Sequence, residues 1–262
     1  MNLSFIYNTP AGIIVLIVFI MMMISNWLGF RVKLYYNSIP GLSLDESPSA
    51  EGALLGLLAL LLAFTFSMSS SRYELRKQII VEEANDIGTA VLRADLYPDS
   101  IRNLFRADFK KYVDSRIAYY DVGFDEKKIQ TALANSNEIS SRIWKRAAAL
   151  GQDPRNLALT NQMIPAVNAM IDIVTTRDAA RNAHVPDVIL FVLFLLLITG
   201  SFIVGYGRKG KRTDWINILV FALMTALTVY LILDLDRPRR GIITLDTSED
   251  KMVELRSMFN VN

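Results

Sequence analysis

Four segments of the chain are continuous apolar runs, and the remainder mixes apolar and polar positions. A helix needs about 20 apolar residues to cross a bilayer, and about 17 is the lower end of the range. The four runs are Gly12–Phe30, Ala53–Met68, Val188–Tyr206 and Trp215–Leu233. The second is the shortest, but the serines that follow it can bond back to the helix and prolong it. The pattern predicts four membrane-spanning helices.

The long segment between the second and third runs is too polar to insert into a membrane. Its few breakers divide it into four pieces with helical spacing of apolar residues, as at Phe105, Phe109 and Tyr112. The four pieces are Ser71–Tyr97, Ser100–Asp121, Asp125–Leu150 and Asn156–Ala183. Asp99 and Asp125 stand where helix N-caps are expected. No run alternates with period two, so strands are not predicted.

We therefore predict an all-α fold. The chain is expected to be a polytopic membrane protein with four transmembrane helices and a membrane-proximal antiparallel helical bundle between helices 2 and 3. The predicted boundaries are 1–70 for the first two transmembrane helices, 71–186 for the bundle, 187–234 for the last two, and 235–262 for a C-terminal tail.

The second apolar run passes into the bundle without a glycine or proline at the join. We expect one unbroken helix from about Leu54 through at least Asp86. Such a helix is a rigid rod between the membrane layer and the bundle, which carries motion from one to the other or simply attaches the bundle.

Composition narrows the function. Apolar residues make up 52% of the chain, and its formal net charge is only +2, without a basic face interleaved with aromatics. We expect no nucleic-acid partner. The chain has no Cys and a single His, His184, which excludes the common zinc sites. It also lacks nucleotide-binding and hydrolase motifs, so we expect no enzyme activity, catalytic residue, cofactor or metal.

Two groups of charged residues are candidate sites, each with a functional and a structural interpretation. Asp234, Asp236 and Arg237 end the fourth apolar run, where they form either a gating cluster at a pore mouth or an interfacial ion-pair lattice with nearby arginines. Glu82 and Glu83 lie along the rod helix. Their carboxylates are expected either to offer oxygens to Ca²⁺ or to pair with a residue such as Arg177.

The stretch LLLAFTFSMSSSRYELRK, residues 60–77, resembles the second transmembrane helix of bacterial bestrophins. Phe64 matches a phenylalanine at the end of the apolar run, Ser67 a small polar residue, and Arg72 a following arginine. The stretches VEEANDIGTAVLRADL and DLDRPRRG are similar to a bestrophin-like domain family of uncharacterised bacterial and plant proteins. That similarity extends from about residue 53 to the C-terminal tail.

The resemblance implies an anion channel that assembles as a symmetric oligomer, with the second helix lining the pore. By position, Phe64 would be a constriction residue, with Leu60 one turn earlier on the same stripe. Gly56 departs from the bulky residue expected another turn earlier. The alternative is that Phe64 and Leu60 face lipid or another helix.

Two functions of different classes are open. One is an oligomeric ion channel, with the lipid bilayer, other copies of the chain and inorganic ions as partners. The other is a non-conducting scaffold or sensor that relays binding from the bundle to the membrane. The expected location is a bacterial inner membrane. Lys209, Lys211 and Arg212 in a short loop favour a periplasmic bundle, whereas Arg239 and Arg240 oppose it.

Overall fold

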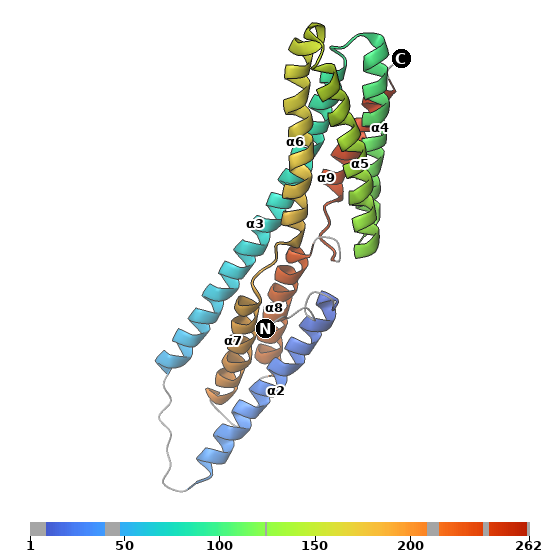
Figure 1. Ribbon diagram of the computed structural model, residues 1–262. Helices are drawn as coiled ribbons and strands as arrows, with labels where there is room; N and C mark the ends of the chain where they lie inside the picture. The colour runs from blue at the N-terminus through green and yellow to red at the C-terminus, as the bar shows by residue number, and fades with distance from the viewer. Residues whose placement is uncertain (1–8, 40–47, 124, 209–214, 238–240, 261–262) are drawn as a thin grey trace. The chain divides into compact units, whose positions relative to one another are not determined.

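The computed structural model describes residues 9–39, 48–123, 125–208, 215–237 and 241–260 (Figure 1). Over these residues the regular elements are helical and none is a strand, which confirms the all-α prediction. The helices are α2 (Ala11–Asn37), α3 (Pro48–Ala94), α4 (Asp99–Asp121), α5 (Glu126–Leu150), η1 (Pro154–Asn156), α6 (Leu157–Asn182), α7 (Asp187–Tyr206), α8 (Trp215–Asp236), α9 (Asp246–Glu254) and η2 (Leu255–Phe259).

The chain divides into two compact units. Unit 1 comprises residues 1–73 and 184–243, and unit 2 comprises residues 74–183 and 244–262. The loop residues 209–214 and 238–240, on which the charge count for membrane topology depends, lie outside the described residues. The side of the membrane on which the helical bundle lies therefore stays a prediction.

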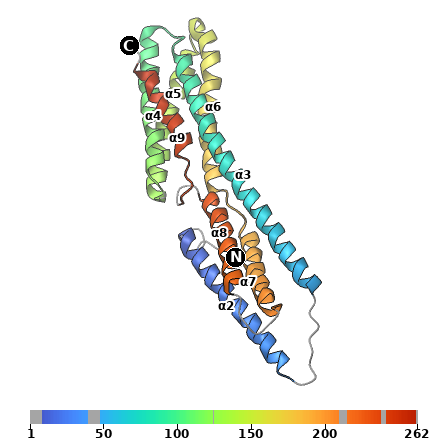
Figure 2. The same cartoon turned by 180° about the vertical axis from the view of Figure 1, so that it is seen from behind.

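Unit 1 contains α2, α7, α8 and the first part of α3 (Figure 2). Helices α2, α3, α7 and α8 each contain a stretch long and apolar enough to cross a membrane, as the sequence predicts. All four helices contribute to one buried apolar core, whose members include Met22, Leu58, Leu193, Leu197 and Val229. The chain is an integral membrane protein.

Helices α2 and α7 approach each other so closely that their main chains touch. A Cβ atom on Gly29 would overlap the carbonyl oxygen of Phe202, and one on Gly205 would overlap that of Asn26. Small residues at such crossings allow the close packing that associates helices in membranes. Beside this crossing, the Ser25 hydroxyl donates to the Ile198 carbonyl (2.7 Å).

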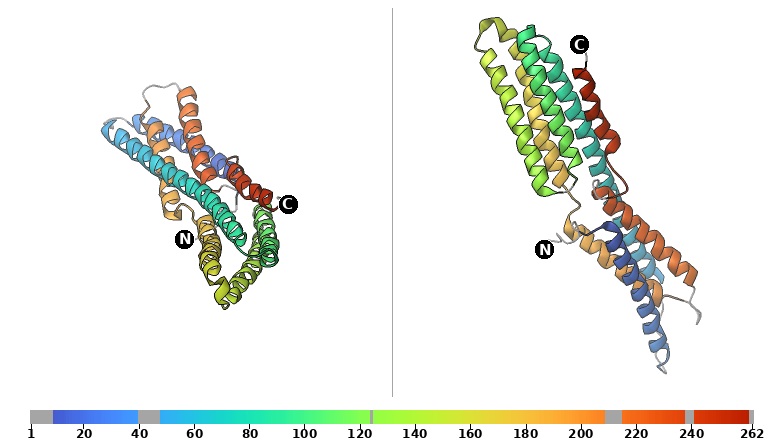
Figure 3. Two further views of the ribbon diagram at one scale, coloured as in Figure 1. Left: turned by 90° about the horizontal axis from the view of Figure 1, so that it is seen from above. Right: turned by 90° about the vertical axis from the view of Figure 1, so that its right-hand side faces the viewer.

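Unit 2 is a bundle of the second part of α3 with α4, α5 and α6 (Figure 3). Its interior is formed by the stripes of apolar residues that the helical spacing predicts, among them Ile87, Phe105, Phe109, Ile143 and Met170, all buried. The connections from α4 to α5 and from α5 to α6 are short, and these consecutive helices run antiparallel.

The helix boundaries follow local capping chemistry. The Asp125 carboxylate accepts from the amides of Lys127 and Lys128, which makes Asp125 the N-cap of α5, as predicted. The prediction for Asp99 is wrong by one residue. Pro98 is the N-cap of α4, and Asp99 is the first helical residue. At this position the Asp99 carboxylate lies near the positive end of the helix dipole and stabilises the helix.

The segment predicted as a C-terminal tail contains two short helices, α9 and η2, which pack against α4. Met252 of α9 is fully buried, and Arg256 of η2 forms an exposed ion pair with Asp114 of α4 (2.9 Å). The end of the chain is thus part of unit 2.

Helix α3 is continuous from Pro48 to Ala94, so the predicted rod is confirmed. We expect Leu75→Pro to lower the stability of the protein by about 3 kcal/mol or more, because proline removes a backbone donor and clashes with the preceding turn. Leu75 is half-exposed, so Leu75→Ala is the matched control and should cost far less. Thermal unfolding of the two purified variants distinguishes them, and equal melting temperatures would contradict the continuity of the helix.

Candidate functional site

Phe64 and Leu60 lie on one exposed stripe of α3. Phe64 is 61% exposed and Leu60, one turn earlier, is 52% exposed. Gly56, another turn earlier, is also exposed and adds no side chain. The opposite side of the same helix is buried in unit 1 at Leu58 and Thr65. The stripe is therefore part of the surface of α3 that unit 1 leaves uncovered.

The same face remains exposed along the rest of α3, where its chemistry changes. At spacings of three, four and seven residues it carries Ser67, Ser71, Gln78, Glu82 and Asn85, all exposed, and Glu74 and Leu75 between Ser71 and Gln78 are exposed as well. We call this row, from Leu60 to Asn85, the α3 stripe. It begins apolar, continues with hydroxyls and ends with an amide and a carboxylate.

Glu83, next to Glu82, points about 100° around the helix and is completely buried. One of its carboxylate oxygens accepts from Nε of Arg116 on α4, and the other accepts from Nη1 of Arg177 on α6, both at 2.5 Å. The structure thus brings Glu83 and Arg177 together and leaves Glu82 on the exposed stripe. The ion pairs connect three helices of unit 2, and because Glu83 and Arg116 are completely buried, removing one partner would leave an uncompensated charge in the interior.

Tyrosine rings surround the two arginines. The Arg116 guanidinium lies 4.7 Å from the centre of the Tyr119 ring, and that of Arg177 lies 3.9 Å from the centre of the Tyr120 ring. Burial opposes the charge of Arg116, but the Glu83 carboxylate outweighs it and raises the pKa of the guanidinium. Burial also raises the pKa of Tyr120, so its hydroxyl stays protonated at neutral pH.

Sequence reasoning missed Arg116, although a signal was present. Arg116 follows Phe105, Phe109 and Tyr112 at helical spacing, so it stands on the apolar stripe of α4. Glu83 and Arg177 occupy the corresponding stripes of α3 and α6. A charge on a buried face needs an opposite charge on another helix. Looking for three such charges together would have identified the cluster.

Two arginines of the bestrophin-like stretch donate to backbone carbonyls. Within unit 1, Nη1 of Arg72 donates to the carbonyl of His184 (2.5 Å). Within unit 2, Arg76 donates to the carbonyls of Ala180 (3.0 Å) and Ala183 (2.6 Å), at the C-terminal end of α6. The last carbonyls of a helix have no partner within it, so a buried guanidinium caps α6.

Asp234 and Asp236 accept from backbone amides. Oxygens of the Asp236 carboxylate accept from the amide of Val185 at 3.2 Å, and Nδ1 of His184 lies 3.5 Å from one of them. The Asp234 carboxylate accepts from the amides of Ile242 (3.0 Å) and Ile243 (2.9 Å). The described contacts of these two buried carboxylates position the chain before α7 and after α8, while two of the expected arginine partners, Arg239 and Arg240, lie outside the described residues.

Arg237, the third member of that predicted group, is also buried and donates to the carbonyl of Thr9 at 2.8 Å. It therefore links the end of α8 to the residues that precede α2. Among the described residues, no group of three or more His, Asp or Glu side chains is placed to hold a metal ion.

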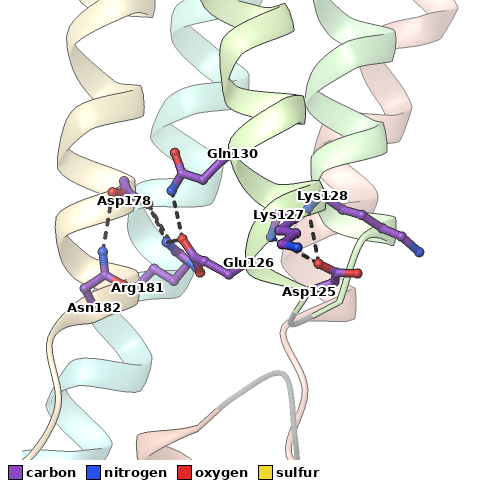
Figure 4. A network of polar contacts seen from close by, with 8 residues as sticks. All are labelled: Asp125, Glu126, Lys127, Lys128, Gln130, Asp178, Arg181 and Asn182. Atoms are coloured by element: carbon purple, nitrogen blue, oxygen red, sulfur yellow. Dashed lines mark hydrogen bonds and ion pairs between the residues drawn. The ribbon is translucent and has the colours of Figure 1, made fainter.

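A second polar network lies where α5 begins and α6 ends (Figure 4). Arg181 bridges the carboxylates of Glu126 (3.1 Å) and Asp178 (3.0 Å), and Gln130 donates to Glu126 (2.8 Å). The hydrogen bond from Arg181 lowers the pKa of the Glu126 carboxyl. Glu126 is well exposed, so the network adds little stability beyond fixing the ends of the two helices.

A model of the bestrophin-like domain matches residues 53–249, which is most of the chain. The chain belongs to the bestrophin-like family. The match begins in α3 and ends in α9, so it includes the α3 stripe and the buried Glu83 cluster of this bestrophin-like protein. The chain matches none of the curated proteins.

The bestrophin-like chain is similar in structure to a bacterial bestrophin homologue from Klebsiella pneumoniae. One variant of that homologue has a TM-score of 0.67 at 11% sequence identity, covering 93% of this chain and 99% of that chain. Another has a TM-score of 0.66 at 14% identity, covering 95% and 97%. A membrane protein of solved structure reaches 0.68 at 12% identity, covering 94% and 98%. The bestrophin-like protein therefore has the bestrophin fold.

Neutralising the carboxylate of the buried cluster should lower the stability of the protein strongly. Glu83→Gln leaves two guanidiniums without a countercharge in the interior of unit 2 and should destabilise the bestrophin-like protein by about 3–5 kcal/mol. Arg256→Gln, which removes an exposed ion pair of the same unit, should cost at most about 1 kcal/mol. Denaturant unfolding of both variants measures the difference. A Glu83→Gln protein as stable as Arg256→Gln would contradict the structural role of the cluster.

Proposed function

We propose that the protein is an oligomeric bestrophin-like ion channel whose pore is lined by α3. Membership of the family and the bestrophin fold support the general class. The observation that supports the assignment of α3 is its stripe, which is exposed from Leu60 to Asn85 and changes from apolar to polar side chains along its length.

The chemistry of the stripe suits a gated pore. Phe64 and Leu60, repeated around a symmetry axis, would form a narrow apolar ring, and apolar constrictions close a pore by excluding water. The ring is closed to ions because an ion loses its hydration shell there without receiving polar contacts. Ser67, Ser71 and Gln78, further along, would line a wider, hydrated part with hydroxyls and an amide. Anions are the ions that the family resemblance implies.

The proposal requires several copies around an axis. A single α3 helix cannot enclose a pore, so the functional protein would be a homo-oligomer in the lipid bilayer. In each copy the bundle would span about residues 71–186, as predicted, and the membrane helices would lie before and after it in the sequence. The other candidate, a non-conducting scaffold, is supported by a hollow of about 650 Å³ between α5 and α6, lined by polar residues such as Asn137 and Thr175 and by apolar ones such as Leu133 and Ile171.

We expect Phe64→Ala to raise the current in reconstituted bilayers, because the shorter side chain widens and hydrates the ring. Each reduction of about 1.4 kcal/mol in the barrier raises the rate of ion passage about tenfold. Phe66→Ala is the matched control. Phe66 is also exposed, at 40%, but lies on the opposite side of α3, so its removal should leave the current unchanged.

Single-channel recording of the parent and both variants, together with the native mass in detergent, tests the proposal. A symmetric oligomer with a larger current for Phe64→Ala alone is the expected result. A monomeric particle or the absence of current from all three proteins would favour the scaffold. Equal increases for Phe64→Ala and Phe66→Ala would contradict the assignment of the stripe to the pore.

A further inference from the structure

Several hydrogen-bond donors in the interior of unit 2 have no acceptor. Arg116 donates through Nε to Glu83, but its Nη1 and Nη2 atoms are buried without a partner. The hydroxyl of Tyr120, one turn further along α4, is also buried and unpartnered. Leaving buried donors unsatisfied costs about 1–3 kcal/mol each, and more when they are charged. This concentration of donors calls for an acceptor.

The neighbouring rings do not supply it. The Tyr119 ring lies over the face of the Arg116 guanidinium, where a cation is attracted to the negative face of the ring. The N–H groups of a guanidinium point outward in its own plane, so a ring stacked on its face leaves them without an acceptor. Tyr120 itself stays protonated, so its hydroxyl can donate a hydrogen bond.

The charges of the fully buried side chains are also unequal. Two buried guanidiniums, Arg116 and Arg177, meet the single fully buried carboxylate of Glu83, and the further carboxylate near Tyr120, that of Glu249 on α9, is only partly buried. Asp108, a buried carboxylate on α4, is engaged by Arg142 (3.1 Å) and Arg146 (2.9 Å) instead. Burying an uncompensated charge costs several kcal/mol. An ordered water would accept the hydrogen bonds but would leave this charge uncompensated.

We propose that the interior of unit 2 binds one small monovalent anion, of the size of a halide, between the Arg116 guanidinium edge and the Tyr120 hydroxyl. The anion completes the cluster by accepting from the free N–H groups of Arg116 and from Tyr120, and it balances the second arginine. Deep burial selects against bulky anions. Because Glu83 and its partners face away from the α3 stripe, this site is distinct from the proposed pore and does not depend on conduction.

Thermal unfolding of the purified full chain tests the site, with sodium bromide or chloride exchanged for sodium gluconate at constant ionic strength. A ligand that binds only the folded state raises the melting temperature with the logarithm of its concentration above Kd. We expect the melting temperature to rise with halide above a defined concentration, and not with gluconate, since gluconate is too large to enter. Equal melting temperatures at all ratios of halide to gluconate would show a hydrated cluster without an anion and overturn the proposal.

Tyr120→Phe separates the site from general salt effects, because it removes one donor and leaves both ion pairs in place. We expect this substitution to raise the apparent Kd for bromide about tenfold, as the loss of one hydrogen bond to a charged group implies. Tyr36→Phe removes an exposed hydroxyl in unit 1 and should leave the Kd unchanged. An unchanged Kd in Tyr120→Phe would contradict the proposal. In crystals grown with bromide, anomalous scattering should place the ion beside Nη1 or Nη2 of Arg116, and a map without that peak would also contradict it.

Discussion

A carboxylate inside a helical bundle is stable only when cations meet its oxygens, since removing it from water costs several kcal/mol. Glu83 meets this condition with one arginine on each oxygen, from two different helices. The three side chains fix the register of α3, α4 and α6 in unit 2, because a shift of any helix by one turn would leave a charge alone. Apolar packing around the cluster can tolerate small changes of shape, whereas the ion pairs cannot.

The ends of the helices are held by the same type of chemistry with backbone partners. Arg76 caps the carbonyls that end α6, while Asp234 and Asp236 accept the amides of the segments beside α7 and α8. A buried chain turn leaves several amides and carbonyls without partners, and charged side chains satisfy them better than neutral ones. Arg76, Asp234 and Asp236 of the bestrophin-like stretches are therefore explained first by backbone hydrogen bonding, whereas Glu83 is explained by its ion pairs.

Much of this architecture could be predicted from the sequence, because apolar length and helical spacing depend only on the chain itself. Helices α4 to α8 begin and end close to their predicted positions, whereas α2 continues to Asn37, beyond the predicted Phe30. Helix α9 could not be predicted, because a helix of nine residues is not stable alone and forms against α4. The partners of Glu83 and Asp236 also depend on which helices become neighbours, and a single sequence does not give that pairing. The exposed position of Phe64 is compatible with both lipid and a pore, so its role required a proposal.

The triad of Glu83, Arg116 and Arg177 also constrains how sequences of this family can change over time. Replacing one member alone leaves a buried charge unmatched, whereas replacing all three with apolar residues of similar size removes both the charges and their cost. Relatives should therefore carry either the complete charged set or a wholly apolar one, and intermediates should be rare. In an alignment, these three widely separated positions would change together, and their covariation would record the contact between three helices.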